Sequence, residues 1–330
     1  MDRGRRLRRP RGGRRGGRRR RRPRLRGEGR RAVDGGRGQP GPLPEEAGDP
    51  PLVISVLILT RDEEKNLPRC LESVRWSDDV VVFDSFSKDH TVDLARAGGA
   101  RVYQHAFLGY GEQREAARTG VAYRHRWVLA VDADETVEAD LVPEIESIAR
   151  AGEGPPWVYR LRRKEYFWGR WLRHAGLYPS WFLRFFRPER VRYGARAVHE
   201  YPEFEGPAGE LRGHLAHHGF HKGLSDWLHK HARYAEMEAE ENLKTLSTGG
   251  IPWRDGLAFR DPVKRRRLMK ELSWRAPCRP TLRFLYMYVL RRGFLDGWPG
   301  LTYCRLLSQY EYLVTLKMKE SARRARGLTI

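Results

Sequence analysis

The apolar positions between residues 52 and 132 fall into runs that are separated by segments of helical spacing. Runs rich in apolar, mostly β-branched residues lie at 52–59, 79–85, 100–105 and 125–132, and helical patterns fill most of the sequence between them. Such runs are typical of strands buried on both faces of a parallel sheet. The alternation predicts an α/β fold with a mostly parallel, doubly wound sheet flanked by helices, whose ligands bind at the carboxyl ends of the strands.

The pattern changes after about residue 155. Up to about residue 205 the sequence is aromatic and basic, which favours short β segments and turns over helices. From residue 223 the spacing is helical, and two further helical patterns cover about 279–292 and 300–319. The apolar face expected on the first of these helices comprises Leu224, Trp227, Leu228, Tyr234, Ala235, Ala239, Leu243 and Leu246.

The positive charge is distributed unevenly along the chain. The 330 residues carry a formal net charge of +22, and residues 1–50 hold 18 arginines against six acids, a net charge of +12. This Arg-rich segment has almost no aliphatic or aromatic side chains to offset the entropy of ordering, so we expect a disordered tail. A basic arm could also bind nucleic acid or anionic lipid. It lacks the apolar stretch of a secretory signal, and we do not interpret it as one.

The cysteines and the lengths of the apolar runs indicate in which cellular compartment the protein works. Cys70, Cys278 and Cys304 have neither paired nor metal-ligand spacing, which suits a reducing environment. The longest late apolar run, at 282–290, is half of the roughly 18 residues that a membrane span needs. We therefore expect a cytoplasmic protein that meets a membrane, if at all, on its surface.

Acidic residues follow the run at 125–132 in the stretch "AVDADET". Asp132 and Asp134 stand one residue apart just beyond a predicted strand, and their oxygens suit a hard cation such as Mg²⁺ or Mn²⁺. The alternative is a solvated turn before a helix at 136–150, since acids also favour helix starts. Polar residues also follow the first two runs, at 60–63 and at 84–85. Three polar clusters are thus expected on one edge of the sheet.

These segments resemble a known family. "TRDEEKNLPRCLESV", "DSFSKDHTVDLA" and "VLAVDADE" are similar to the nucleotide-sugar domain of family 2 glycosyltransferases, which have the GT-A fold. "GRWLRHAGLYPSWFLRFFR", "LSDWLHKHARYAEMEAE" and "FLYMYVLRRGFLDGWPGL" resemble bacterial lipopolysaccharide core glycosyltransferases of the inner-core β-1,4-glucosyltransferase type. The resemblance implies a GT-A domain over 51–220, with a nucleotide-sugar half at 51–150 and an acceptor half at 151–220. Residues 221–330 would form a helical, membrane-associated extension.

The resemblance also implies roles for individual residues. Thr60, Arg61 and Glu63 would line the nucleotide pocket, and Asp84 would bind the uracil ring of a UDP-sugar. The remaining donor-site residues would be Arg114 near the base or diphosphate, Asp132 on the ribose or the metal, and Asp134 as the principal metal ligand, with His218 completing the coordination. Two departures, Phe86 where glycine is common and Glu115 where asparagine often stands, leave the choice of donor open.

Family 2 enzymes invert the anomeric carbon, so a carboxylate must accept the proton of the attacking hydroxyl. Glu200 in "AVHEYPE" is the candidate, with Glu203 and Glu135 as competing carboxylates and a surface glutamate as the alternative interpretation. A zinc site built from the histidines between 199 and 221 lacks familiar ligand spacing.

The expected acceptor is a saccharide carried by a lipid of the cell envelope. Aromatic and arginine side chains alternate between Trp168 and Arg187, and such residues stack on sugars and pair with phosphates, although most of these aromatics are expected in the core. A late apolar stripe suits an interfacial helix on an anionic bilayer, or equally a helix packed on its own domain. The stripe comprises Tyr303, Leu306, Leu307, Tyr310, Leu313 and Val314.

The sequence thus predicts an inverting, metal-dependent glycosyltransferase of lipopolysaccharide core or related envelope glycan synthesis. We expect it in the cytoplasm, with a peripheral position on the inner face of the bacterial inner membrane as one option. The rival from another class is a nucleic-acid-binding protein that uses the Arg-rich arm. A nucleotidyltransferase is less favoured, because no glycine-rich phosphate loop follows the first run.

Overall fold

The structure is a computed structural model that describes residues 52–151, 154–194, 202–248 and 278–329. The Arg-rich arm and the candidate base Glu200 both lie outside the described residues.

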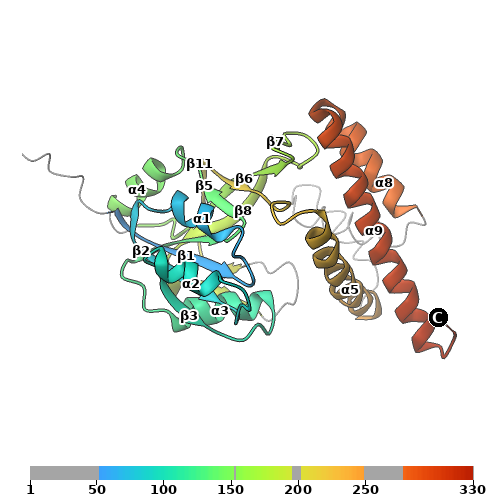
Figure 1. The fold of residues 1–330 in the computed structure, drawn as a ribbon, viewed down its shortest axis with the longest axis horizontal. Helices are drawn as coiled ribbons and strands as arrows, with labels where there is room; N and C mark the ends of the chain where they lie inside the picture. Colours follow the sequence, from blue (N-terminus) through green and yellow to red (C-terminus); the bar gives the residue numbers. More distant parts are fainter. Residues whose placement is uncertain (1–51, 152–153, 195–201, 249–277, 330) are drawn as a thin grey trace, which may run out of the picture. The chain divides into compact units, whose positions relative to one another are not determined.

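The first half of the sheet has the predicted parallel arrangement (Figure 1). Strand β1 pairs in parallel with β2 on one side and with β4 on the other, and β3 pairs in parallel with β2. The elements are β1 (Leu52–Thr60), α1 (Leu67–Ser73), β2 (Ser77–Asp84), α2 (Thr91–Ala97), β3 (Arg101–Gln104), α3 (Tyr110–Gly120) and β4 (Trp127–Asp132). The alternation of strands and helices is confirmed, although each helix is shorter than its sequence pattern.

The second half continues the same sheet with two antiparallel strands, β8 and β5, whereas β6 and β11 pair in parallel with each other. The order is β3-β2-β1-β4-β8-β6-β11-β5, with β8 antiparallel to β4 and β6, and β5 antiparallel to β11. The elements are β5 (Glu135–Val137), α4 (Val142–Arg150), β6 (Val158–Phe167), β7 (Arg170–Trp171), β8 (Ser180–Phe186), β9 (Val191–Tyr193), β10 (Pro202–Phe204) and β11 (Ala208–His217). No helix separates β6 from β8, and strands joined without a crossover helix readily pair antiparallel. The sheet is therefore mixed.

The helix expected at 136–150 begins later than predicted. Residues Glu135–Val137 form β5 against β11, and α4 starts at Val142. Glu135 consequently belongs to a strand rather than to the first turn of a helix.

Alternate residues of the central strands form two separate cores. Ile54, Val56 and Ile58 of β1 pack with side chains of α1, α2 and α4, whereas Leu57 packs with Ala117 of α3. Because side chains alternate along a strand, both faces of the sheet are covered. This explains why the first strand is apolar throughout.

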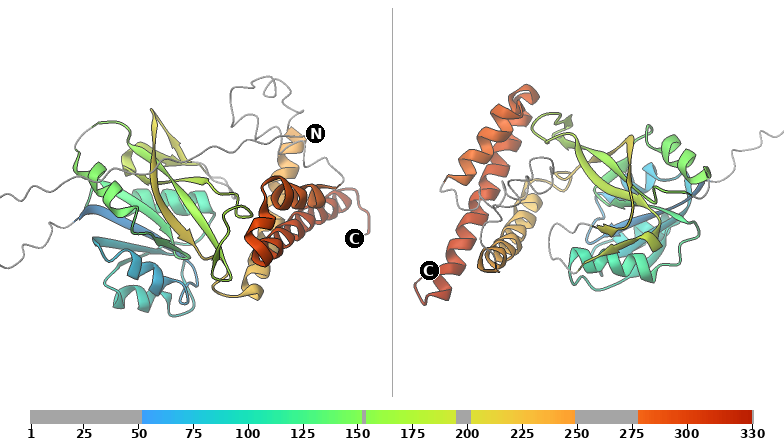
Figure 2. Two further views of the ribbon diagram at one scale, coloured as in Figure 1. Left: turned by 90° about the horizontal axis from the view of Figure 1, so that it is seen from above. Right: turned by 180° about the vertical axis from the view of Figure 1, so that it is seen from behind.

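The C-terminal helices pack on one another (Figure 2). Helix α5 (Leu224–Thr248) contacts α9 (Gly297–Ala325), and α9 contacts α8 (Arg279–Leu285), which continues through a π turn, η2 (Tyr286–Leu290), and a 3₁₀ turn, η3 (Gly293–Asp296). Within the described residues, no helix combines the length and the hydrophobicity that a membrane crossing requires.

The apolar stripe of α9 faces the protein. Val314 is fully buried against Ala235 and Ala239 of α5, and Leu306 packs with Trp227. Part of this stripe therefore packs on the protein itself, in agreement with the alternative of a helix packed on its own domain, whereas Leu313 is 39% exposed. On α5 the expected apolar face is only partly buried, because Leu224 and Leu228 are 47% and 45% exposed.

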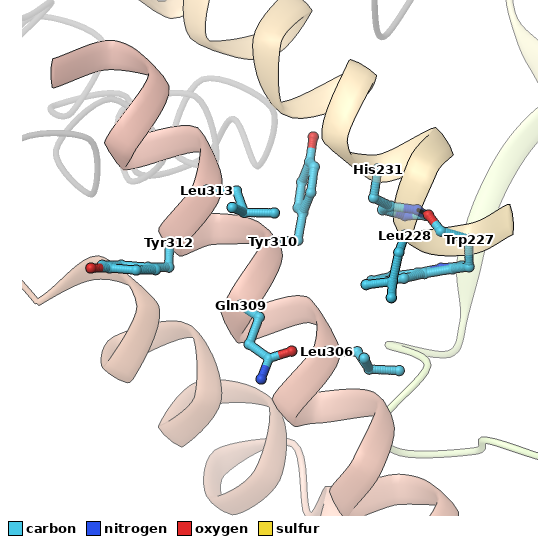
Figure 3. A pocket seen from close by; sticks show the side chains of 8 residues that line it. All are labelled: Trp227, Leu228, His231, Leu306, Gln309, Tyr310, Tyr312 and Leu313. Atoms are coloured by element: carbon cyan, nitrogen blue, oxygen red, sulfur yellow. Dashed lines mark hydrogen bonds between the residues drawn. The ribbon is translucent and has the colours of Figure 1, made fainter. Parts of the chain in front are cut away.

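A half-buried histidine, His231, links the two long helices. The ring of His231 stacks on Trp227 with centroids 3.7 Å apart and meets Tyr310 edge-on. Figure 3 shows these side chains around an apolar cavity of about 270 Å³ between α5 and α9. Burial lowers the pKa of His231 to about 4.

The helical extension should lose stability in acid through His231. Between pH of about 6.5, where an unfolded histidine titrates, and about 4, the unfolded chain binds a proton that the folded protein does not, so the free energy of unfolding falls as the pH falls. Urea unfolding at about pH 7 and pH 5 should show a smaller loss for His231→Phe than for wild type. The matched control His229→Phe, at an exposed position of the same helix, should keep the wild-type loss. Equal losses in all three proteins would contradict this role.

Candidate functional site

The carboxyl ends of three strands bring the polar clusters together. Thr60 at the end of β1 lies beside Asp84 of β2, and Leu59 lies beside Asp132 of β4. The predicted convergence of the three clusters on one sheet edge is confirmed.

Asp84 is a buried acceptor at the centre of two interlocked loops. Its carboxylate accepts hydrogen bonds from Thr60 Oγ1 (3.0 Å), from Gln104 Nε2 (3.1 Å), and from both the amide (2.9 Å) and the hydroxyl of Ser87. The loop after β1 is tied to the same segment, because the amide of Asp62 donates to Ser87 Oγ at 2.8 Å. All of the carboxylate's partners are groups of the protein.

Phe86 adopts a left-handed backbone conformation, with φ of 53°. Glycine is favoured at such positions because it lacks a Cβ. The Phe86 side chain is 57% exposed, so it does not pack into the core.

Asp132 is held by two arginines. Arg114 Nη2 of α3 lies 2.9 Å from Asp132 Oδ1, and Arg184 of β8 contacts both carboxylate oxygens. Burial raises the pKa of Asp132, but the two guanidinium groups outweigh this and hold it well below its usual range. The side chain of Arg114, expected near the base or diphosphate, is thus directed to Asp132.

Glu135 is fully buried and belongs to the same charge network. It accepts a hydrogen bond from the amide of Asp132 (3.0 Å) and pairs with Arg163 (3.3 Å) and Arg184 (3.2 Å). A carboxylate with these partners and no exposure is not available to an acceptor hydroxyl, which removes Glu135 from the candidate bases.

Asp134 lies against a histidine and a lysine. Its Oδ2 atom is 3.3 Å from His217 Nε2 and 3.7 Å from Lys230 Nζ of α5. Burial raises the pKa of Asp134, but His217 and Lys230 outweigh this and hold it well below its usual range. His217 Nδ1 in turn lies 2.5 Å from Glu165 Oε2 of β6. Burial lowers the pKa of His217, yet Glu165 and Asp134 raise it to about 10.

His218 has a different environment from the one expected. Its ring stacks on Tyr166 with centroids 5.0 Å apart, and only its backbone amide reaches Asp134, donating to the carbonyl at 2.8 Å. The imidazole that meets the Asp134 carboxylate is His217, one residue earlier.

Glu63 and Arg61 line the loop after β1. Glu63 pairs with Lys222 at 2.8 Å and accepts a hydrogen bond from Asn66 at 2.7 Å. Burial, and then the nearby Asp134, raises the pKa of Glu63. The exposed Arg61 lies over the ring of Phe107, 5.4 Å from its centroid.

A second cluster of potential metal ligands lies elsewhere on the sheet. In the described part of the chain, ligand atoms of Glu138, Asp140 and His214 lie within 4.8 Å of one another. His214 pairs with Asp140 through Nδ1 (2.5 Å) and with the Tyr178 hydroxyl through Nε2 (2.9 Å), and Glu138 pairs with Lys164. Both nitrogens of the His214 imidazole thus have side-chain partners within the protein.

Comparison with known proteins identifies the first part of the described sheet. Residues 55–203 match the sequence family described as glycosyl transferase family 2. This part of the chain is therefore similar to glycosyl transferase family 2 domains. Its mixed, mostly parallel sheet flanked by helices is a GT-A-like fold, which confirms the predicted fold class.

Two relatives and one solved structure describe the extent of the similarity. An uncharacterized glycosyltransferase of Rickettsia typhi is 25% identical over 286 residues, 83% of this chain and 89% of the relative. The lipopolysaccharide core biosynthesis glycosyltransferase LpsC of Rhizobium meliloti is 27% identical over 223 residues, 65% of this chain and 79% of LpsC. Glucosyl-3-phosphoglycerate synthase of Mycobacterium tuberculosis, solved with Mn²⁺ and UDP, is 23% identical with a TM-score of 0.29 over 34% of this chain and 44% of that one. That score is too low to inform the ligands of the present site.

Several residues of the site carried no signal in the sequence. Arg184, Glu165 and Arg163 are charged residues in β strands that are otherwise aromatic or basic, and their partners are 28 to 52 residues away. Lys230 lies on the helical extension. For Arg184 the sequence offers one indication of a buried ion pair: the strand alternation directs this charged side chain towards the inside of the protein.

Removing Arg184 should destabilise the domain. Arg184→Met would leave the buried Glu135 and the half-buried Asp132 short of a cation, and breaking a buried ion pair from one side costs about 3–5 kcal/mol. Urea unfolding measures the loss. The control Arg96→Met, at an exposed position of α2, should change stability by less than about 0.5 kcal/mol. A wild-type midpoint for Arg184→Met would show that the network is not stabilising.

Proposed function

We propose that this protein is an inverting, metal-dependent glycosyltransferase that moves a sugar from a nucleotide diphosphate donor, a UDP-sugar, to a saccharide on a lipid of the cell envelope. The observation that carries the proposal is the family 2 domain, whose acidic strand end at Asp134 meets an imidazole held by a second carboxylate. Within the family we propose the inner-core glucosyltransferase type.

The nucleotide would lie across the carboxyl ends of β1 and β2. Thr60, Arg61 and Glu63 would line its pocket, and Asp84 would accept the N–H of uracil. Since the Asp84 carboxylate is now occupied by protein donors, one of them would have to give way to the base. Arg114 and Asp132 would act as a pair, with the carboxylate directed to the ribose by the two arginines that hold it.

The residues at Asp134 fit a divalent cation. A carboxylate oxygen and an imidazole nitrogen 3.3 Å apart are suitable ligands for Mn²⁺ or Mg²⁺, and metal-binding histidines usually bond a carboxylate through their other nitrogen, as His217 does with Glu165. Asp134 and His217, rather than His218, would therefore hold the metal. Asp132 fits less well, because its oxygens already pair with arginines. When bound, the metal would neutralise the charge on the departing diphosphate.

The reaction requires one displacement. The acceptor oxygen forms a bond to the anomeric carbon, the bond from that carbon to the phosphate oxygen breaks, and its electron pair leaves with the nucleoside diphosphate. The hydroxyl proton passes to a carboxylate, for which we propose Glu200, with Glu203 on β10 as the competitor. Lys222 and Lys230 add positive charge beside Glu63 and Asp134, on the side where the diphosphate would lie.

The acceptor assignment draws support from two observations. LpsC, a relative over 79% of its length, is named for lipopolysaccharide core biosynthesis. In the aromatic segment, Phe185 and Phe186 are core, but Trp168 and Trp181 are 61% and 40% exposed, so part of each ring is accessible to a sugar. An acceptor in the envelope would be met on the cytoplasmic face of the inner membrane.

A donor screen tests the enzyme. Purified protein should release UDP from a nucleotide sugar in the presence of a saccharide acceptor and Mn²⁺, and chelation should abolish turnover. Asp134→Asn and Glu200→Gln should each lower kcat by at least about 100-fold. NMR of the product should show inversion. Inactivity toward all nucleotide sugars, together with RNA binding that disappears on deletion of residues 1–50, would favour the nucleic-acid-binding alternative.

A second experiment separates the two histidines. Glu165→Gln should raise the Mn²⁺ concentration for half-maximal UDP release by about 10–100-fold, because it removes the partner that orients His217. His217→Asn should raise it at least as much, whereas the matched variant His218→Asn should stay close to wild type. The opposite ranking of the histidine variants would return the metal to His218.

A further inference from the structure

The turn that joins α8 to α9 exposes large apolar side chains. Five of the ten residues from 289 to 298 are apolar and between 48% and 73% exposed. We call them the turn surface: Val289, Leu290, Phe294, Leu295 and Trp298. Figure 1 shows α8 and α9 meeting at this turn, at the end of α9 opposite the C-terminus. This density of exposed apolar residues is typical of an interaction site.

The turn is fastened at its base. Asp296, 3% exposed, accepts hydrogen bonds from the amides of His174 (2.9 Å) and Ala175 (2.7 Å), and Arg291 donates to the carbonyl of Tyr178 at 2.8 Å. Gly293 and Gly300 approach so closely that a Cβ on Gly300 would lie 2.4 Å from the Gly293 carbonyl oxygen. The exposed side chains therefore project from an ordered turn.

The charge around the turn surface has one sign. From residue 279 to 310 the sole acid is Asp296, which is buried, whereas Arg292 and Arg305 are exposed and Arg283 and Arg291 are partly exposed. Basic side chains near an anionic bilayer strengthen binding to it. Apolar and aromatic side chains with a basic rim and no exposed acid between residues 279 and 310 match the interface of such a bilayer.

We propose that the turn surface inserts into the headgroup region of an anionic lipid bilayer and docks the protein on the membrane. The proposal rests on the proposed function for its purpose, since a lipid-linked acceptor lies in a membrane. It uses residues other than the α9 stripe, which is partly buried. The other occupants of such a surface, a second copy of this chain or another protein, are outcomes of the test.

A fluorophore on the turn tests insertion directly. In the full chain with the exposed Cys278 replaced by serine, Leu290→Cys labelled with nitrobenzoxadiazole should brighten and shift to shorter wavelength on vesicles of phosphatidylcholine and phosphatidylglycerol. The same label at Leu108→Cys, an equally exposed position (72% against 73%), should not respond. This comparison separates insertion of the turn from attraction of the Arg-rich arm, which would bring both labels to the surface alike. Sedimentation with vesicles but no response at Leu290 would overturn the proposal.

A variant with added negative charge measures how much the turn surface contributes to vesicle binding. Replacing Leu290, Phe294 and Trp298 by glutamate should weaken vesicle binding at high salt by at least about tenfold, since each tenfold is 1.4 kcal/mol and three apolar side chains are lost. Glutamates at Leu108, Leu316 and Leu328 add the same charge and should have a smaller effect. Donor hydrolysis without acceptor should be equal in wild type and the turn variant, so failure of docking and failure of the enzyme are distinguishable. A dimer in light scattering that the turn glutamates dissociate, without a lipid response at Leu290, would assign the surface to a second copy instead.

Discussion

The site depends on balancing acids that are buried together. Asp132, Asp134 and Glu135 stand within four positions, and each would be costly to bury alone. The strands beyond β4 supply the cations: Arg184 comes from the antiparallel β8, and Arg163 and His217 come from β6 and β11, which pair in parallel. The second half of the sheet therefore provides the charges that the acidic strand end needs as well as its packing neighbours.

The parallel half of the fold could be predicted because its signal is local. The apolar runs at 52–59 and 125–132 indicate buried strands. The carboxyl ends of parallel strands lie at the same edge of a sheet, so the residues that follow them are brought together. The fold class and the convergence of Thr60, Asp84 and Asp132 follow from that pattern. The order of strands in the second half does not, since it depends on pairings such as β6 with β11, whose residues are 50 or more positions apart.

Within the site, the residue types could be predicted better than their partners. Asp134 stood out by its spacing, but whether His217 or His218 faces it depends on which way each side chain points from the end of β11, and a shift of one residue reverses that direction. The stripe on α9 shows the same limit. Helical spacing identifies an apolar face, but only the position of α5 decides whether water, lipid or protein covers it.

The fastening of Asp296 has a geometric consequence. The segment that it holds, His174 to Ala175, follows Leu172, whose amide donates to the carbonyl of Glu165, and Glu165 in turn holds His217. A short series of hydrogen bonds thus connects the exposed turn to the acidic strand end. If the turn rests in a bilayer, this connection fixes the distance between the membrane surface and the acidic strand end. The protein would then select acceptors by the distance of their terminal sugar from the lipid.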